Sequence, residues 1–142
     1  QEIPDTLYLR QAGHYDSTTC IGCGLDEGVA ELSSSRARTA AAKVMIVMTD
    51  GKPNIAPGGA SPGDYCVEQA TAAEELGITL YTVGVGADVD HELLQEMADI
   101  GHGEYFFADS APDPATGLPM YVTQLQEIFE TLGGRRPVRL IQ

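Results

Sequence analysis

The amino-acid sequence predicts a Rossmann-like α/β domain with a mostly parallel sheet and helices on both faces. Three observations support this class. From Leu25 onward, short apolar runs typical of strands alternate with amphipathic segments typical of helices. This alternation implies right-handed crossovers between parallel strands, with helices covering the sheet. The length of 142 residues lies near the commonest size of one domain, so residues 1–142 are expected to form a single domain.

The first elements follow from hydrophobic spacing. Residues 6–9 are a candidate short strand. Leu25, Val29 and Leu32 recur at helical spacing, and the serine run after them is expected to end this helix. Residues 43–49 form a nearly continuous apolar run, which predicts a strand buried on both faces of the sheet.

Turn residues separate that strand from the next elements. Residues 50–54 are a strong turn signal, and a loop rich in proline and glycine follows. Asp64 is expected to cap the next helix and Gly77 to end it. Residues 78–85 are β-branched and aromatic, which predicts a second strand.

The last third of the chain repeats this alternation. Asp88 or Asp90 is expected to cap a helix, and residues 104–108 are a strand candidate. Apolar residues at helical spacing over residues 125–132 predict a final amphipathic helix. Residues 138–141 are a candidate for a terminal strand.

The charge of the chain limits its partners. Eight Lys and Arg against twenty-one Asp and Glu give a formal net charge of −13. This charge argues against nucleic acid and against an anionic membrane surface, because both are bound by clustered cations. It is compatible with divalent cations. No apolar run approaches the roughly 20 residues that span a bilayer, so no direct membrane insertion by this chain is expected.

The loops after the strands are the first place to look for a binding site, because ligands of open α/β sheets bind at the carboxyl ends of strands. Asp50 directly follows the first apolar run, and Gly51 permits a tight turn beside it. A carboxylate held there is well placed to hold a cation, although Asp often only caps a turn. Residues 17–25 form a second loop that opens a helix, where hydroxyl and N–H groups bind ions or simply cap the helix.

These segments together resemble the von Willebrand factor type A (vWA) family. Residues 19–25 (TCIGCGL) look like the family's T-x-I-x-x-x-L loop, which supplies the threonine of the metal-ion-dependent adhesion site (MIDAS). Residues 44–51 (VMIVMTDG) look like the core strand that ends in the MIDAS aspartate. Residues 77–86 (GITLYTVGVG) look like the following strand. The resemblance covers roughly residues 17–132 and implies the vWA fold.

The resemblance also implies a function. Thr19 and Asp50 would belong to a divalent cation site for Mg²⁺, or for Mn²⁺ or Ca²⁺. The hydrated cation would complete its shell with a carboxylate from a protein partner. The chain would then be a protein-binding, adhesion-type module and not an enzyme.

One part of the family's pattern is missing. The D-x-S-x-S loop, which supplies an aspartate and two serines, is absent, and residues 16–19 (DSTT) are its nearest imitation. We therefore expect an incomplete site, and a partial domain whose first strand, first helix and second strand lie upstream of Gln1. Residues 129–141 are similar to the ends of vWA proteins of the Tad pilus-assembly (TadG-like) group. That similarity implies a bacterial envelope protein with its vWA domain outside the cytoplasmic membrane.

Three cysteines allow different chemistries. The pair Cys20-x-x-Cys23 is typical of a redox-active motif, or of half a zinc site that Cys66 and His14 would complete. The vWA resemblance implies that the three cysteines lie at one rim of the sheet. A disulfide from Cys66 to Cys20 or Cys23 would fit an exported protein, and three free thiols are the alternative.

Two further functions stay open. The first is a metal-independent structural component of a bacterial envelope or pilus system, which the missing D-x-S-x-S loop favours. The second is a Rossmann-like enzyme, either a hydrolase that uses Asp50 or a thiol–disulfide protein that uses Cys20 and Cys23. The binding module is the preferred interpretation.

Overall fold

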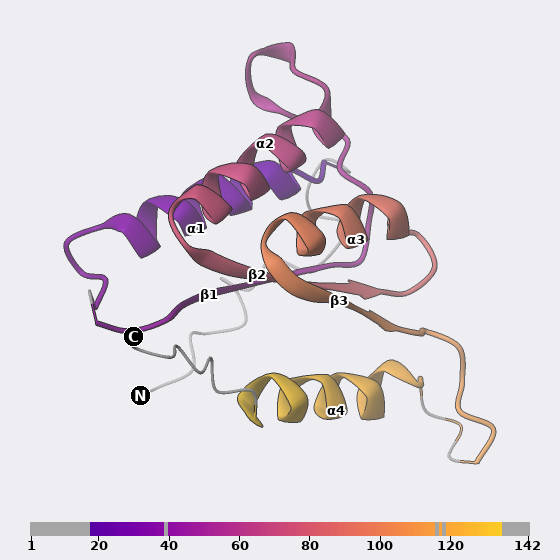
Figure 1. Cartoon of the computed structure of the whole chain (residues 1–142). Helices are drawn as coiled ribbons and strands as arrows, with labels where there is room; N and C mark the ends of the chain where they lie inside the picture. The colour runs from indigo at the N-terminus through magenta and orange to yellow at the C-terminus, as the bar shows by residue number, and fades with distance from the viewer. Residues whose placement is uncertain (1–17, 39, 116, 118, 135–142) are drawn as a thin grey trace, which may run out of the picture.

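A three-stranded parallel sheet between two layers of helices forms the centre of the molecule (Figure 1). The computed structural model describes residues 18–38, 40–115, 117 and 119–134. The strands lie in the order β1-β2-β3, with helices α1, α2 and α3 on one face and α4 on the other. This confirms the predicted α/β class with helices on both faces. The strand candidates at 6–9 and 138–141 lie outside the described residues.

The elements begin and end close to the predicted positions. Asp90 caps α3 as expected, because its carboxylate accepts a hydrogen bond of 3.2 Å from the N–H of Leu93. Gly77 follows α2 with a φ of 67°. The expectation that Asp64 caps α2 is wrong. Ser61 is the residue before the helix and Pro62 is its first residue, so Asp64 lies inside the first turn. The bounds are α1 Ile21–Ser33, β1 Lys43–Thr49, the 3₁₀ helix η2 Pro57–Gly59, α2 Pro62–Glu75, β2 Ile78–Val85, α3 His91–Ile100, β3 His102–Ala108 and α4 Tyr121–Gly134.

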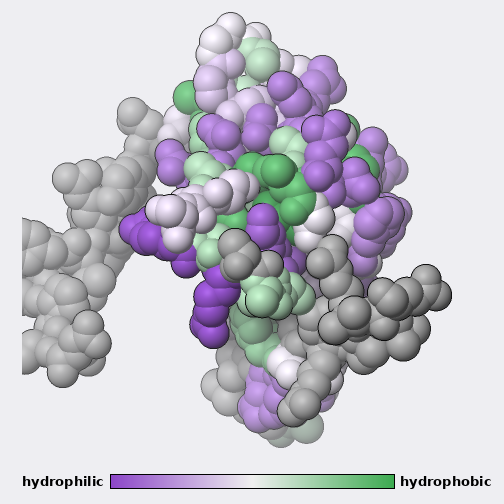
Figure 2. Space-filling view, turned by 60° about the vertical axis from the view of Figure 1, so that its left-hand side comes forward, coloured by the Kyte–Doolittle hydropathy of each residue, from purple (hydrophilic) through white to green (hydrophobic). Residues whose placement is uncertain are grey.

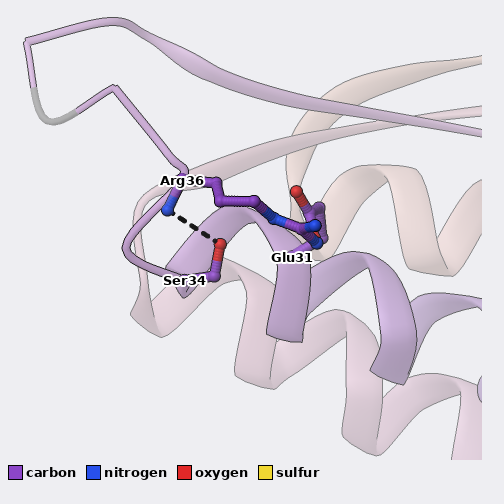
Figure 3. Close-up of polar contacts among 3 residues, drawn as sticks. All are labelled: Glu31, Ser34 and Arg36. Atoms are coloured by element: carbon purple, nitrogen blue, oxygen red, sulfur yellow. Dashed lines mark hydrogen bonds and ion pairs between the residues drawn. The ribbon is translucent and has the colours of Figure 1, made fainter.

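The carboxyl end of α1 is closed by local polar contacts, shown in Figure 3. The Ser34 hydroxyl accepts a hydrogen bond of 3.2 Å from the Arg36 N–H, and the Arg36 guanidinium pairs with the Glu31 carboxylate. Both members of the ion pair are exposed, so the pair contributes at most about 1 kcal/mol. The predicted end of the helix at the serine run is confirmed, since Ser33 is its last residue.

Burial distinguishes the central strand from its neighbour. Most residues of β2 are buried, on both faces of the sheet. The prediction that residues 43–49 are buried on both faces is wrong, because only one face of β1 packs against α1 and the core. On the other face Val44, Ile46 and Met48 are 40%, 41% and 55% exposed. The helix on that side, α4, packs against β3.

Two hydrophobic cores lie on opposite faces of the sheet. The larger core joins the sheet to α1, α2 and α3, and Leu25, Leu80 and Leu94 are fully buried in it. The smaller core joins the sheet to α4 through Val83, Ala108 and Ile128. In the view of Figure 2, apolar side chains also gather at the surface between hydrophilic ones.

A buried hydroxyl links the central strand to α3. Thr82 is fully buried, and its Oγ1 donates a hydrogen bond of 2.7 Å to the Leu94 carbonyl oxygen. We expect Thr82→Val to lower the free energy of unfolding by about 1 kcal/mol, the net value of such a bond. Urea unfolding measures the change. The matched control is Thr71→Val, whose hydroxyl donates to the Val67 carbonyl at the exposed surface, and which should stay within about 0.5 kcal/mol of the parent. Equal effects at the two sites would contradict the role of burial.

Candidate functional site

The carboxyl ends of the three parallel strands meet at one rim of the sheet. The strands end there at Thr49, Val85 and Ala108. At the last step of the β1–β2 register, Thr49 lies beside Gly84, and Val85 lies beside Ala108 in the β2–β3 register. This rim is where open α/β sheets bind ligands.

The turn after β1 is held by its own threonine. The Thr49 hydroxyl donates a hydrogen bond of 3.0 Å to the Gly51 carbonyl oxygen and accepts one of 3.2 Å from the Gly51 N–H. Asp50 lies between these two residues and is exposed. The turn therefore presents an accessible carboxylate at the end of a strand that is fixed in the sheet.

The loop before α1 is fastened to the loop after β1. The Thr19 N–H donates a hydrogen bond of 2.7 Å to Asn54 Oδ1, and the Asn54 N–H donates one of 3.0 Å to the Thr19 carbonyl oxygen. A Cβ placed on Gly51 would lie 3.7 Å from Thr19 Oγ1. The structure thus brings the Thr19 loop and the Asp50 turn together at the rim.

Asn54 is the residue that sequence analysis missed. It is the last residue of the turn signal at 50–54, and hydrophobic spacing carries no information there. The available signal was the residue type, because Asn side chains readily bond backbone groups in loops. Its partner lies 35 residues earlier in the chain, which no local pattern identifies.

The donors at this rim suit a hard cation. The Asp50 carboxylate and the Thr19 hydroxyl are oxygen ligands, the type that Mg²⁺ and Ca²⁺ take. In the part of the chain that the structure describes, no three His, Cys, Asp or Glu side chains gather as a metal-binding group. Carboxylates of the described residues therefore cannot complete the coordination shell of a cation. A cation bound at this rim would also need hydroxyl oxygens and water as ligands.

The cysteines differ from the expected pairing. Cys20 and Cys23 form a disulfide with their Cα atoms 5.2 Å apart, and Cys66 is a buried free thiol. The expected bond from Cys66 to Cys20 or Cys23 is not formed, because Cys20 caps α1 and Cys23 lies one helical turn away. Cysteines in a disulfide offer no thiolate to zinc, and His14 lies outside the described residues. Burial raises the pKa of the Cys66 thiol, against which a hydrogen bond from the Gly22 backbone acts.

A cavity of about 440 Å³ opens beside this rim. Residues 19–21, Gly24 and Gly28 line it from the side of α1, and residues 45–49 line it from β1. Cys20 is therefore part of its wall.

In the described residues, no helix is long and apolar enough to cross a membrane.

The fold and the rim define a parallel α/β domain with a loop-built candidate site at the carboxyl ends of its strands. The profile of the von Willebrand factor type A domain matches residues 8–120. The chain belongs to the von Willebrand factor type A domain family, which confirms the resemblance seen in the sequence.

The relatives and solved structures that resemble this chain match only part of it, or only with part of their own length. Human and bovine matrilin-1 are each 39% identical to this chain over 74 residues, which is 52% of this chain. The chain spans only 13% of the human protein. Proximal thread matrix protein 1 from the mussel byssus, solved with a zinc-occupied MIDAS motif, is 24% identical with a TM-score of 0.55, over 80% of this chain and 23% of that chain. An uncharacterized membrane-spanning protein from Vibrio fischeri is 25% identical with a TM-score of 0.50, over 69% of this chain and 48% of that chain.

Proposed function

We propose that this domain binds a protein partner through a divalent cation, Mg²⁺ or Mn²⁺, held at the rim by Asp50 and Thr19. When bound, the cation would supply a positive charge, and a carboxylate of the partner would complete its coordination shell. Asp50 contributes the negative charge that retains the ion, and Thr19 contributes a hydroxyl oxygen. No nucleophile or general base takes part, so the proposed role is binding and not catalysis.

The observation that carries this proposal is the pair of hydrogen bonds between Thr19 and Asn54. They hold the Thr19 loop beside the turn that bears Asp50, although the two loops are distant in sequence. The zinc-occupied MIDAS motif of the mussel protein supports the choice of a metal as the ligand of this fold. The net charge of −13 further favours a cation over an anion as the direct ligand.

The test is thermal unfolding with Mn²⁺ or Mg²⁺ against EDTA. A cation at 100 times its dissociation constant should add about 2.7 kcal/mol to the free energy of unfolding, or roughly 5–11 °C in Tm. We expect Asp50→Ala to abolish this rise. Asp99→Ala is the matched control, since Asp99 is an exposed aspartate on α3, and it should keep the rise.

Three results would contradict the proposal. A domain whose Tm is the same in Mn²⁺ and in EDTA does not hold the ion at useful affinity. A rise that both aspartate variants retain would reflect general charge screening on an acidic protein and not a site at Asp50. A rise that both variants lose would also contradict the assignment to Asp50, because the control carboxylate would matter equally.

A second proposed function is a metal-independent assembly component outside the cytoplasmic membrane of a bacterium, as in the Tad pilus-assembly group. The disulfide between Cys20 and Cys23 favours an oxidising compartment. The likeness to a membrane-spanning protein from Vibrio fischeri favours an envelope setting. The thermal experiment separates the two proposals, because a Tm that is the same in Mn²⁺ and in EDTA supports assembly without metal.

A further inference from the structure

The bond between Cys20 and Cys23 lies at a chemically unusual place, the first turn of a helix. Cys20 is the N-cap of α1, and its sulfur accepts a hydrogen bond of 3.3 Å from the Cys23 N–H. An N-cap side chain normally supplies an oxygen to the unpaired amides of the first turn. In this chain a disulfide sulfur takes that position.

We infer that the Cys20–Cys23 disulfide is a thiol–disulfide exchange site, which accepts electrons from a dithiol reductant. The inference is independent of the cation proposed above. It concerns a bond that closes a loop with only two residues between the cysteines, so it constrains the unfolded chain less than a long-range disulfide would. A stabilising role therefore explains this bond poorly.

The helix favours the reduced form of the pair. A thiolate on Cys20 would face the Cys23 N–H at the positive end of the α1 dipole, where negative charge is stabilised. Stabilisation of the reduced form makes a disulfide a better oxidant. It also makes Cys20 the better leaving group, so attack is directed to the sulfur of Cys23.

Access separates this pair from the third cysteine. Cys20 and Cys23 are both partly exposed, and Cys20 lines the cavity between α1 and β1. Cys66 is fully buried on α2, beside the backbone of Gly22 in the same turn. The chain thus contains a reachable disulfide and a protected thiol in one region, and the protected thiol serves as an internal reference.

The exchange balances in two steps. A thiolate of the reductant attacks the Cys23 sulfur, the S–S bond breaks, and its electron pair leaves on Cys20. The second thiolate of the reductant then attacks the mixed disulfide and releases Cys23. Two electrons pass to the pair, the two thiol protons end on Cys20 and Cys23, and the reductant leaves as a disulfide.

Reduction of the disulfide should change the hydrogen exchange of Thr19 first. This residue is the direct chain neighbour of Cys20 and is bonded to Asn54 through its N–H. Without the Cys20–Cys23 disulfide, only hydrogen bonds hold the loop before α1 in place. We therefore expect faster hydrogen exchange of the Thr19 N–H in the reduced domain, with the central strand unchanged.

The experiment uses the whole chain with Cys66→Ala, so that the pair supplies every thiol. The oxidised protein is equilibrated with mixtures of reduced and oxidised dithiothreitol in native buffer, and free thiols are counted by alkylation and mass spectrometry. We expect the dithiol to accumulate while circular dichroism stays native. Once reduced, Cys20 should be alkylated at least about 10-fold faster than Cys66 in the parent chain. A disulfide that is reduced only when the chain unfolds would overturn the inference. The Cys20–Cys23 bond would then have a structural role.

Two single-cysteine variants test the direction of attack. In the Cys66→Ala background, Cys23→Ser leaves the thiol at the N-cap, and Cys20→Ser leaves the thiol one turn later. We expect the first to react with an aromatic disulfide down to lower pH than the second, because the helix start stabilises its thiolate. The reverse order would overturn the assignment of Cys20 as leaving group. Both variants also lack the bond, so their Tm values show whether the domain folds without it.

Discussion

Replacing Gly103 by alanine is expected to lower the free energy of unfolding by about 3 kcal/mol or more, at or above the top of the usual range for overpacking. A Cβ at this position would lie 1.9 Å from the Leu80 carbonyl oxygen and 2.6 Å from its carbonyl carbon. These are backbone atoms of the central strand, so they cannot move aside as a flexible side chain would. The close approach follows from the irregular register between Leu80 and Thr82, where β3 begins against β2.

The matched control is the same substitution at Gly24. This glycine lies inside α1, is exposed, and would place its new Cβ within 4 Å of nothing. Alanine should raise stability there by about 0.5–1 kcal/mol, because glycine is a poor helix former. Thermal and urea unfolding measure both variants. Two glycine variants that change stability in the same direction would show that close approach to Leu80 does not decide the outcome.

Replacing Leu94 by alanine is expected to cost about 2–5 kcal/mol, the range for a leucine removed from a packed core. Leu94 is fully buried where α3 meets the sheet. Its Cδ1 lies 3.1 Å from the place where a Cβ on Gly84 would stand, so the side chain closes directly over β2. The cavity left behind has little freedom to collapse against a rigid strand.

Leu76→Ala is the control for this substitution. Leu76 directly follows α2 as its C-cap and is 46% exposed, so replacing it by alanine should stay within about 0.5 kcal/mol of the parent. Urea unfolding gives both values, and an unchanged slope with denaturant shows that the denatured states are comparable. A loss below about 1 kcal/mol at Leu94 would mean that the larger core is looser than its burial indicates.

The sequence predicted those features that depend on local chemistry. The spacing of Leu25, Val29 and Leu32 identified α1, and the start of α3 was expected at Asp88 or Asp90, of which Asp90 is the cap. The order of strands and helices predicted a parallel sheet, whose carboxyl edge then selected Asp50 for attention. The helix and its cap follow from neighbours within a few positions of one another, and the sheet follows from the order of such local elements along the chain.

Features that depend on distant neighbours were predicted less well. The apolar run of β1 was expected to be buried on both faces, but an apolar side chain is buried only where another element covers it. Val44, Ile46 and Met48 lack that cover in the described residues. Asn54 was found only through its bonds to Thr19, which lies 35 residues earlier. The pairing of Cys20 with Cys23 is local and was missed for another reason: the vWA resemblance pointed to Cys66 as the partner.

The pair of hydrogen bonds between Thr19 and Asn54 has a thermodynamic consequence for any ligand that binds at the rim. Backbone segments that are ordered only when a ligand arrives lose conformational entropy at that moment, by about 1–2 kcal/mol per residue. Because both hydrogen bonds already join the Thr19 loop to the loop after β1, that loss is incurred when the domain folds. The rim is preorganised, so a ligand that fits it keeps more of its interaction energy as affinity.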